Sequence, residues 1–580
     1  MGANPILEAD TNLKLNARPV NFKPRLGLRA WMDRVLEECD RADKDFDADA
    51  VHDLRVALRR CRSLADGLMA LDPDSSWKAM KKAGKKIFQE LGDLRDMQVM
   101  EEWIEKLSGR PGEKQDVVED PVAIKLLDYI KSREAGFKQL ARKDLDQFDR
   151  RQWRQWSKIQ PQRAGRVRPG SLVYMHLALE KWTQAYDLHR RALRTRSTIG
   201  WHELRIGIKH FRYTVENFLP QQHARWGDDL KELQDLLGDV HDLDVLWATA
   251  ISADLHAFPD ALSRKQWREK LSEARNERLA RYREKMAGRQ SLWRIWRAEL
   301  PSGPQLHAAA LSRLRTWAGY LDPDFAHSQR VAEVALRLYD GLKDAGVVTP
   351  ASPHAGQLNL EYDPRAVLQA AALMHEVGKA RGAKNHQKKS YRMIRGLERP
   401  LGWSGRELEL AAVVARYHRG ALPRPRGKIM QRIEMPDRPL ATLLAGILRL
   451  SVALNGRQRR NEKQREPVAK SGSRIAAKSA ATKRIEVCLQ DQVILLRVEG
   501  YSALDRFAEE VAAARHLLET VLRRPVLVRT LRNSNRQVET RAQSDAGNGA
   551  NNRASNGANN NEKRIGESVR QPTRHNHKAA

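Results

Sequence analysis

The segment HDLRVALRRCR, His52–Arg62, returns 150 positions later as HELRIGIKHFR, His202–Arg212. Both copies read His-x-Leu-Arg-x-x-x-basic-x-x-Arg. On a helix at 100° per residue, the basic positions of each copy fall within an arc of roughly 80°. These positions are His52, Arg55, Arg59 and Arg62 in the first copy and His202, Arg205, Lys209 and Arg212 in the second. Apolar residues occupy the far side, so each copy predicts a helix with one basic and one buried face.

The duplication continues downstream, where LGDLRDMQV (91–99) matches LGDVHDLDV (237–245). Asp96 and Asp242 recur after the glycine of each copy. One hypothesis is that these carboxylates hydrogen-bond and orient the Arg or His side chains of the first helices. The other is that each caps the amino terminus of the following helix. The sequence leaves both open.

A further basic run, WKAMKKAGKKIFQE, lies between the two motifs of the first copy. Lys78, Lys82 and Lys85 share one face of it, flanked by Lys81 and Lys86, and the second copy keeps only Lys231. Columns of like charge destabilise a helix slightly, so they indicate an anionic ligand that relieves the repulsion. Two such helix pairs, facing each other across a pseudo-two-fold axis, predict a helical bundle with a positive channel or groove. Solvated surface charge is the alternative interpretation.

These duplicated motifs resemble the CHAD domain, and the resemblance covers about residues 24–300. It implies an antiparallel helical bundle with internal two-fold symmetry that binds inorganic polyphosphate in a basic central cleft. It also implies association with polyphosphate granules. The polyphosphate-binding residues that it implies are His52, Arg55, Arg59, Arg62, Lys78, Lys82, Lys85, His202, Arg205, Lys209, Arg212 and Lys231.

The charge of the chain agrees with a polyanionic partner. The 580 residues carry a formal net charge of +31, which favours a polyanion, an anionic membrane surface or an acidic protein. Three widely spaced cysteines give no metal-binding pattern and are typical of a reduced, intracellular protein. No signal peptide precedes the helices, and the longest apolar stretch, LATLLAGILRLSVAL, is too short to span a bilayer. We therefore expect a cytoplasmic protein without membrane contact, and a buried helix at this stretch. A bacterial origin is a separate expectation that these features do not carry.

Segments that contain Pro and Gly, together with changes in composition, divide the chain into regions. After a lead-in at 1–23 and the CHAD-like part at 24–300, a helical region is expected at 303–455. A basic linker follows at 456–484, then a small α+β segment at 485–532 and a disordered tail at 533–580. The fold class is therefore mainly α, an internally duplicated antiparallel helical bundle followed by a helical domain and a small α+β segment.

The second helical region holds polar landmarks at His327, His375-Glu376, His386 and His418. It resembles the HD superfamily of phosphohydrolases, in which His ligands and the Asp of a His-Asp pair bind a divalent metal that activates water. Here the pair is His-Glu, and the late helix offers no Asp. Candidate metal ligands are His327, His375, Glu376 and His418; a buried hydrogen-bonded cluster is the alternative.

A closer resemblance is to the carboxy-terminal region of Ppx/GppA exopolyphosphatases, over about residues 303–532. It is carried by the His-Glu-Val-Gly run, by RYHR (416–419), by LRLSVALN (448–455) and by the mixed segment at 484–532. In that family the region accompanies an actin-like domain that carries the chemistry, and nothing in this sequence supplies one. The resemblance therefore implies a polyphosphate-contacting module without its catalytic half.

Three functions follow from these patterns. The first is non-enzymatic polyphosphate binding, with no catalytic residues and no required cofactor. The second is a metal-dependent phosphohydrolase that uses a divalent metal at the histidine cluster. The third is non-specific nucleic-acid binding through the basic linker and tail, although the scattered tryptophans do not form the exposed aromatic platforms typical of such binders.

Overall fold

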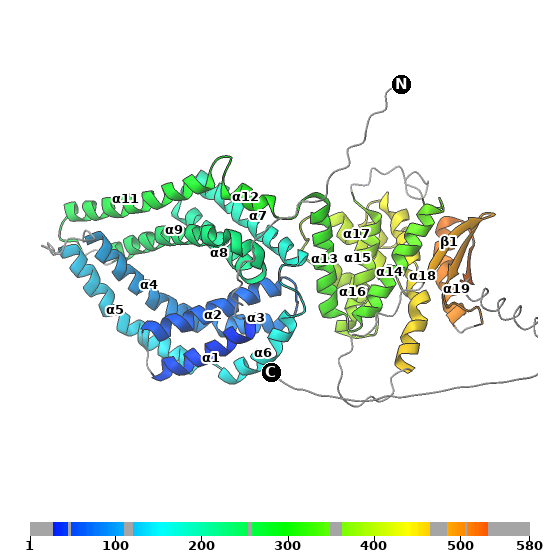
Figure 1. The fold of residues 1–580 in the computed structure, drawn as a ribbon, viewed down its shortest axis with the longest axis horizontal. Coiled ribbons are helices and arrows are strands. Elements are labelled where there is room, and N and C mark those ends of the chain that lie inside the picture. The colour runs from blue at the N-terminus through cyan, green and yellow to red at the C-terminus, as the bar shows by residue number, and fades with distance from the viewer. Residues whose placement is uncertain are drawn as a thin grey trace, which may run out of the picture.

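The computed structural model describes residues 27–44, 48–108, 120–252, 258–348, 362–464, 484–504 and 507–531. They form two helical bodies side by side, with a small sheet at the far end of the second (Figure 1). The predicted fold class, mainly α with a small α+β segment, is confirmed. The lead-in at 1–23, the tail at 533–580 and most of the linker lie outside the described residues. Helix α18 (Asp437–Gln464) continues into the range assigned to the linker.

The first body consists of two halves in sequence. The first half comprises α1 (Leu28–Lys44), α2 (Ala48–Met69), α3 (Ser75–Ala83), α4 (Lys85–Ser108), α5 (Pro121–Asp146) and α6 (Arg150–Ala164). The second comprises α7 (Leu172–Thr195), α8 (Thr198–Phe218), α9 (Pro220–Ser252), α11 (Ala261–Met286) and α12 (Leu292–Ala298). The two copies of the repeated motif are α2 and α8. Gly84 ends α3, whereas its duplicate position, Leu230, lies inside the continuous helix α9.

The predicted apolar faces of α2 and α8 form the core of the first body. Leu54, Leu58, Leu204 and Phe211 are fully buried there. Burying each of these side chains contributes about 1.5–3 kcal/mol, so the apolar stripes fix the rotation of both helices. With the core side of each helix fixed, the basic side must face away from it.

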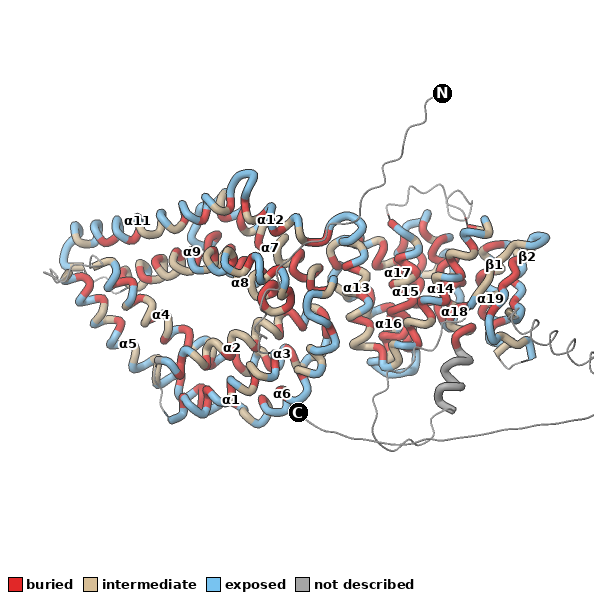
Figure 2. The backbone as a smooth tube through the Cα atoms, in the orientation of Figure 1, coloured by how far each residue is buried: buried red, intermediate tan, exposed pale blue. Residues whose placement is uncertain are grey.

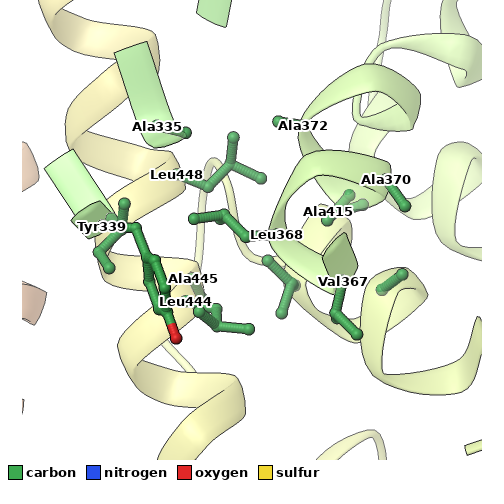
Figure 3. Packing of buried hydrophobic residues seen from close by; sticks show 14 of the residues in the cluster. Ala335, Tyr339, Val367, Leu368, Ala370, Ala372, Ala415, Leu444, Ala445 and Leu448 are labelled. Carbon is green, nitrogen blue, oxygen red and sulfur yellow. The ribbon is translucent and has the colours of Figure 1, made fainter. Parts of the chain in front are cut away.

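The second body is built around α15 (Pro364–Met374). Its other helices are α13 (Gly303–Leu321), α14 (Phe325–Asp344), η1 (Val377–Arg381), α16 (His386–Arg395), α17 (Gly405–Arg416), η2 (Met430–Arg432) and α18 (Asp437–Gln464). Leu368 of α15 belongs to one core cluster with Ala335 of α14 and with Leu444 and Leu448 of α18 (Figure 3). Figure 2 shows that α15 and α17 are mostly buried, whereas α11 of the first body is mostly exposed.

The apolar stretch of α18 is a buried helix, as predicted, with Leu444 and Leu448 at 0% exposure. Among the described helices, none has the length and apolar character needed to cross a membrane.

A three-stranded sheet completes the second body. Strands β1 (Ile485–Gln490) and β2 (Val493–Val498) are antiparallel, joined by Asp491 and Gln492, which both have positive φ as a two-residue hairpin turn requires. Strand β3 (Val526–Thr530) pairs parallel to β2 after α19 (Phe507–Leu522). Ile494 and Leu496 belong to the same core cluster as α15 and α18. The α+β segment and the helices thus share one core.

Helix α13 joins the two bodies, because it packs against α7 on one side and α15 on the other. Arg313 of α13 forms an ion pair with Glu180 of α7. Across the same boundary, the Tyr320 hydroxyl donates to the Arg163 carbonyl at 2.9 Å, and Nε2 of His176 lies 2.8 Å from the Leu401 carbonyl oxygen.

Candidate functional site

The two copies of the basic stripe meet where α2 packs against α8. Lys209 of α8 is half-buried there, and burial together with Arg205, Arg59, Arg55 and Arg62 lowers its pKa to about 8. All four neighbours that depress it are arginines. We call these five residues the α2–α8 cation cluster: Arg55, Arg59, Arg62, Arg205 and Lys209. The structure therefore brings together residues that the sequence placed on separate helices.

Phe88 of α4 positions two arginines of the cluster. The guanidinium carbons of Arg55 and Arg62 lie 5.0 and 4.9 Å from the centre of its ring. Arg55 donates to the Phe88 carbonyl at 3.4 Å, and Arg62 donates to the Lys81 carbonyl at 3.3 Å. Burial lowers the pKa of both guanidinium groups. Stacking on a ring limits the rotamers of an arginine, so these two are held in place before a ligand arrives.

The side chains of the other three members of the cluster can donate N–H hydrogen bonds to a ligand. Within the described residues, no ion pair or hydrogen bond engages the side chains of Arg59, Arg205 or Lys209, and all three are partly exposed. Cations held close together, with no carboxylate in ion-pair contact with these three side chains, are stabilised by an added anion. This arrangement is suited to a ligand that carries several negative charges.

Asp96 and Asp242 lie in the interiors of α4 and α9, so the helix-capping hypothesis for them is wrong. Burial raises the pKa of both carboxyl groups, that of Asp242 to about 6, against the opposing charges of Arg55 on Asp96 and Arg205 on Asp242. The described contacts include no hydrogen bond from these carboxylates to the basic side chains. They act on the cluster through charge.

The two histidines of the motif occupy different surroundings. His52 is exposed near the start of α2. His202 places its Nδ1 atom 3.2 Å from Nδ1 of His241 on α9. Burial, followed by the charge of Arg205, lowers the pKa of His241 to about 4. Arg95 takes the place of His241 in the first copy, so the second half carries a neutral ring where the first carries a charge.

The lysines of the first copy differ in their exposure to solvent and in their contacts. Lys78, Lys82 and Lys85 are exposed. Lys81, a flanking residue in the sequence pattern, instead pairs with Asp66 of α2 and lies near the cluster. On the helix, Lys81 lies about 40° from the buried Trp77, and Lys82 about 140° from it. The lysine nearest the buried face is therefore the one that reaches α2.

The remaining predicted residues, Arg212 and Lys231, lie near Asp235 of α9, which offsets part of their charge. Nε of Arg212 is buried without a hydrogen-bond partner. Gln89 stands at the duplicate position of Asp235. At this position the first copy therefore lacks the carboxylate that offsets part of the positive charge in the second copy.

The histidines of the second body converge in its interior. His327 on α14, His375 and Glu376 after α15, His386 at the start of α16 and His418 after α17 are all at most 5% exposed. Two groups of potential metal-ligand atoms share the Glu376 carboxylate, namely His327, His375, Glu376 and Glu376, His386, His418. His386 is a polar landmark of the sequence that was not among the predicted metal ligands. His386 is the first residue of α16, and no helical periodicity of the sequence connects it with the other histidines.

Hydrogen bonds fix the rings of this cluster. Nδ1 of His375, His386 and His418 lies 2.7, 3.1 and 2.7 Å from the backbone carbonyl oxygen three residues earlier in each case. Burial lowers the pKa of His375 to about 3 and that of His418 well below its usual value. Asn455 contacts His327 at 2.9 Å, from the late helix in which the sequence offered no Asp.

Comparison with protein families decides the architecture. The family model of the CHAD domain matches residues 27–251. The first body contains a CHAD domain. The family model described as Ppx/GppA phosphatase, domain III, matches residues 315–496, which run from α13 into β2. The resemblances to the CHAD domain and to the carboxy-terminal region of Ppx/GppA proteins are confirmed, and CHAD domains are associated with polyphosphate binding. No curated protein matches the chain.

Proposed function

We propose that this protein binds inorganic polyphosphate, with the α2–α8 cation cluster of its CHAD domain as the central contact. The observation that carries the proposal is Lys209, a half-buried ammonium whose nearest charged neighbours include four arginines. Repulsion within such a cluster destabilises the unliganded protein. A polyanion bound between the two stripes relieves this repulsion, which increases its affinity.

The chemistry of the cluster is complementary to a chain of phosphates. Guanidinium groups donate paired N–H bonds to phosphate oxygens, and the lysine adds a compact charge. Donors come from two helices that contact each other, so successive phosphates of a linear ligand can be bound from both sides. We propose His52, His202, Arg212, Lys231, Lys78, Lys82 and Lys85 as outer contacts along the same ligand.

The aromatic residues support polyphosphate over single-stranded nucleic acid. Sequence-tolerant nucleic-acid binders stack bases on exposed aromatic side chains. Among the described residues, no Trp, Tyr or Phe is exposed, and Trp77 and Trp201 are at most 2% exposed. Binding of this kind needs no catalytic group, and we propose association with cytoplasmic polyphosphate granules as its setting.

Titration calorimetry of the full chain with long-chain polyphosphate tests the proposal. The variant Arg59→Ala, Arg205→Ala, Lys209→Ala removes three charges without disturbing the Phe88 stack. We expect at least a roughly 100-fold loss of affinity, since a hydrogen bond to a charged group contributes about 1.5 kcal/mol or more.

The matched control is Arg190→Ala, Arg194→Ala, Arg268→Ala, which removes three exposed arginines of the same body. It should bind nearly as the wild type does. If both variants lose affinity equally, binding follows overall charge and the cluster is not the site. Equal affinity of the wild type for single-stranded DNA and polyphosphate at physiological salt would favour the nucleic-acid alternative.

A further inference from the structure

A cavity of about 730 Å³ lies where the two halves of the first body meet. Its wall is formed by α1, α2 and α6 of the first half and by α7 and α8 of the second. Arg60, Leu64 and Leu68 of this wall lie about 170° around α2 from the arginines of the α2–α8 cation cluster. The cavity is therefore separate from the proposed polyphosphate site, and its size is typical of sites for small molecules, which are roughly 300–1,000 Å³.

The wall of the cavity is mainly apolar. Aromatic side chains come from three helices, Trp31 of α1, Tyr174 of α7 and Phe218 of α8, and Leu64 and Leu68 of α2 complete this surface. The rings of Tyr174 and Phe218 are stacked with their centres 4.3 Å apart. Water in such surroundings finds few hydrogen-bond partners, so an apolar molecule that displaces it gains affinity.

Arg60 supplies one directed polar group in this apolar wall. Its Nη1 atom lies 2.6 Å from Oε1 of Glu216, and its guanidinium carbon lies 5.7 Å from the centre of the Trp31 ring. Its Nε atom is buried and has no hydrogen-bond partner in the described part of the chain. Buried N–H donors are almost always satisfied in folded proteins, so a ligand that brings an acceptor to this atom would be stabilised.

The charges of the wall favour an uncharged ligand. Arg60 is paired with Glu216, and Arg29 at the rim lies 3.7 Å from Asp33. An anionic group that approached Nε of Arg60 would also approach the Glu216 carboxylate, which repels it. A carbonyl oxygen accepts the same hydrogen bond without this repulsion.

We propose that the cavity binds an uncharged, largely apolar small molecule whose carbonyl oxygen accepts a hydrogen bond from Nε of Arg60. The body of the molecule contacts Trp31, Leu68 and Phe218. This site goes beyond polyphosphate binding and does not depend on it.

The experiment titrates the full chain, without polyphosphate, into Nile red, an uncharged apolar dye that carries a carbonyl group. The emission of this dye increases in apolar surroundings. We expect a saturable increase with one dye per chain. The dye should also raise the melting temperature, because a ligand that binds only the folded state stabilises it.

Two variants locate the dye in the cavity. Ala164→Phe places a ring inside the wall and should abolish saturable binding. Arg60→Lys keeps a positive charge beside Glu216 but removes the Nε donor, so it should weaken binding about 3- to 10-fold, as expected for one hydrogen bond. The matched controls Ala135→Phe and Arg190→Lys make the same exchanges at exposed positions on α5 and α7 and should bind as the wild type does.

A wild-type chain without saturable dye binding would overturn the proposal, whether water or another segment of the chain fills the cavity. Wild-type affinity in Ala164→Phe would overturn it as well, because the dye would then bind elsewhere. If that variant does not fold, Arg60→Lys still decides the matter: unchanged affinity would show that Arg60 donates no hydrogen bond to the ligand.

Discussion

Gly92 and Arg55 are in contact only because glycine has no side chain: a Cβ atom at position 92 would lie 2.6 Å from Nη1 of Arg55. At the duplicate position, Gly238, a Cβ atom would meet nothing within 4 Å. The two halves of the CHAD domain therefore use the same glycine differently. In the first half it makes room for an arginine of the cation cluster, and in the second it has no such neighbour.

This difference gives a matched pair of variants. Gly92→Ala should displace the Arg55 guanidinium from Phe88 and weaken polyphosphate binding about 3- to 10-fold, the equivalent of roughly one ordinary hydrogen bond. Gly238→Ala should stabilise the fold by about 0.5–1 kcal/mol, as expected for Gly to Ala inside a helix, and leave binding unchanged. Calorimetric titration and urea unfolding of both variants check this. Equal binding by both would show that Arg55 is not part of the site.

Polyphosphate binding should depend on pH through Lys209. The pKa of this lysine is lowered to about 8 in the free protein, and a bound anion raises it again, so binding takes up a proton above pH 8. We expect the affinity to fall about tenfold between pH 7 and pH 9 by linkage. Lys209→Arg keeps its charge throughout this range and should abolish most of that decrease. A variant with the wild-type pH profile would contradict this assignment.

The ionised side chain of Asp242 should lower the free energy of unfolding at neutral pH. Because its folded-state pKa, about 6, lies above the ordinary value of 3.8, folding favours the protonated form, and the wild type loses stability as pH rises from near 4 to near 6. Asp242→Asn should therefore increase the free energy of unfolding by about 1–3 kcal/mol at pH 7. Urea denaturation at pH 7 and pH 4 checks the sign, since the increase should vanish at pH 4.

The ion pair between Arg313 and Glu180 should stabilise the contact between the two bodies. Their side chains are 12% and 17% exposed, so Arg313→Ala leaves a largely buried carboxylate without its partner. A loss of about 2–4 kcal/mol is expected, with faster hydrogen exchange along α13 and α7. The control is Arg365→Ala, which breaks an exposed pair with Asp340 and should cost less than about 1 kcal/mol. Similar losses in both variants would show that the boundary is solvated.

Helical periodicity was sufficient to predict the two duplicated helices and their buried faces. Leu54 and Leu204 recur at the same place in each stripe, and burial follows from that spacing. Periodicity gives the direction of a side chain but not the neighbour it meets. For this reason the pattern grouped Lys78 with Lys82, whereas it is Lys81 that pairs with Asp66 across to α2.

Contacts between distant segments could not be read from the sequence. His386 and His418 are 32 residues apart, and their approach depends on how α16 packs on α17. Likewise, Asn455 comes to His327 from a helix 128 residues later. That helix has no Asp at this place, and an Asn gives no sequence signal for such a contact.

Helix α13 also limits how this architecture can be recombined. The helix packs on both α7 and α15. A gene fusion that ends the CHAD domain near residue 300 would therefore remove α13 and its packing contact with α7. The carbonyl of Leu401 and the side chain of Arg313 would go with it, leaving His176 and Glu180 uncovered. Transplanting the CHAD domain alone therefore calls for two compensating surface substitutions, at His176 and Glu180, or for a cut placed after Leu321, which keeps Arg313 with Glu180 and leaves only His176 to be substituted.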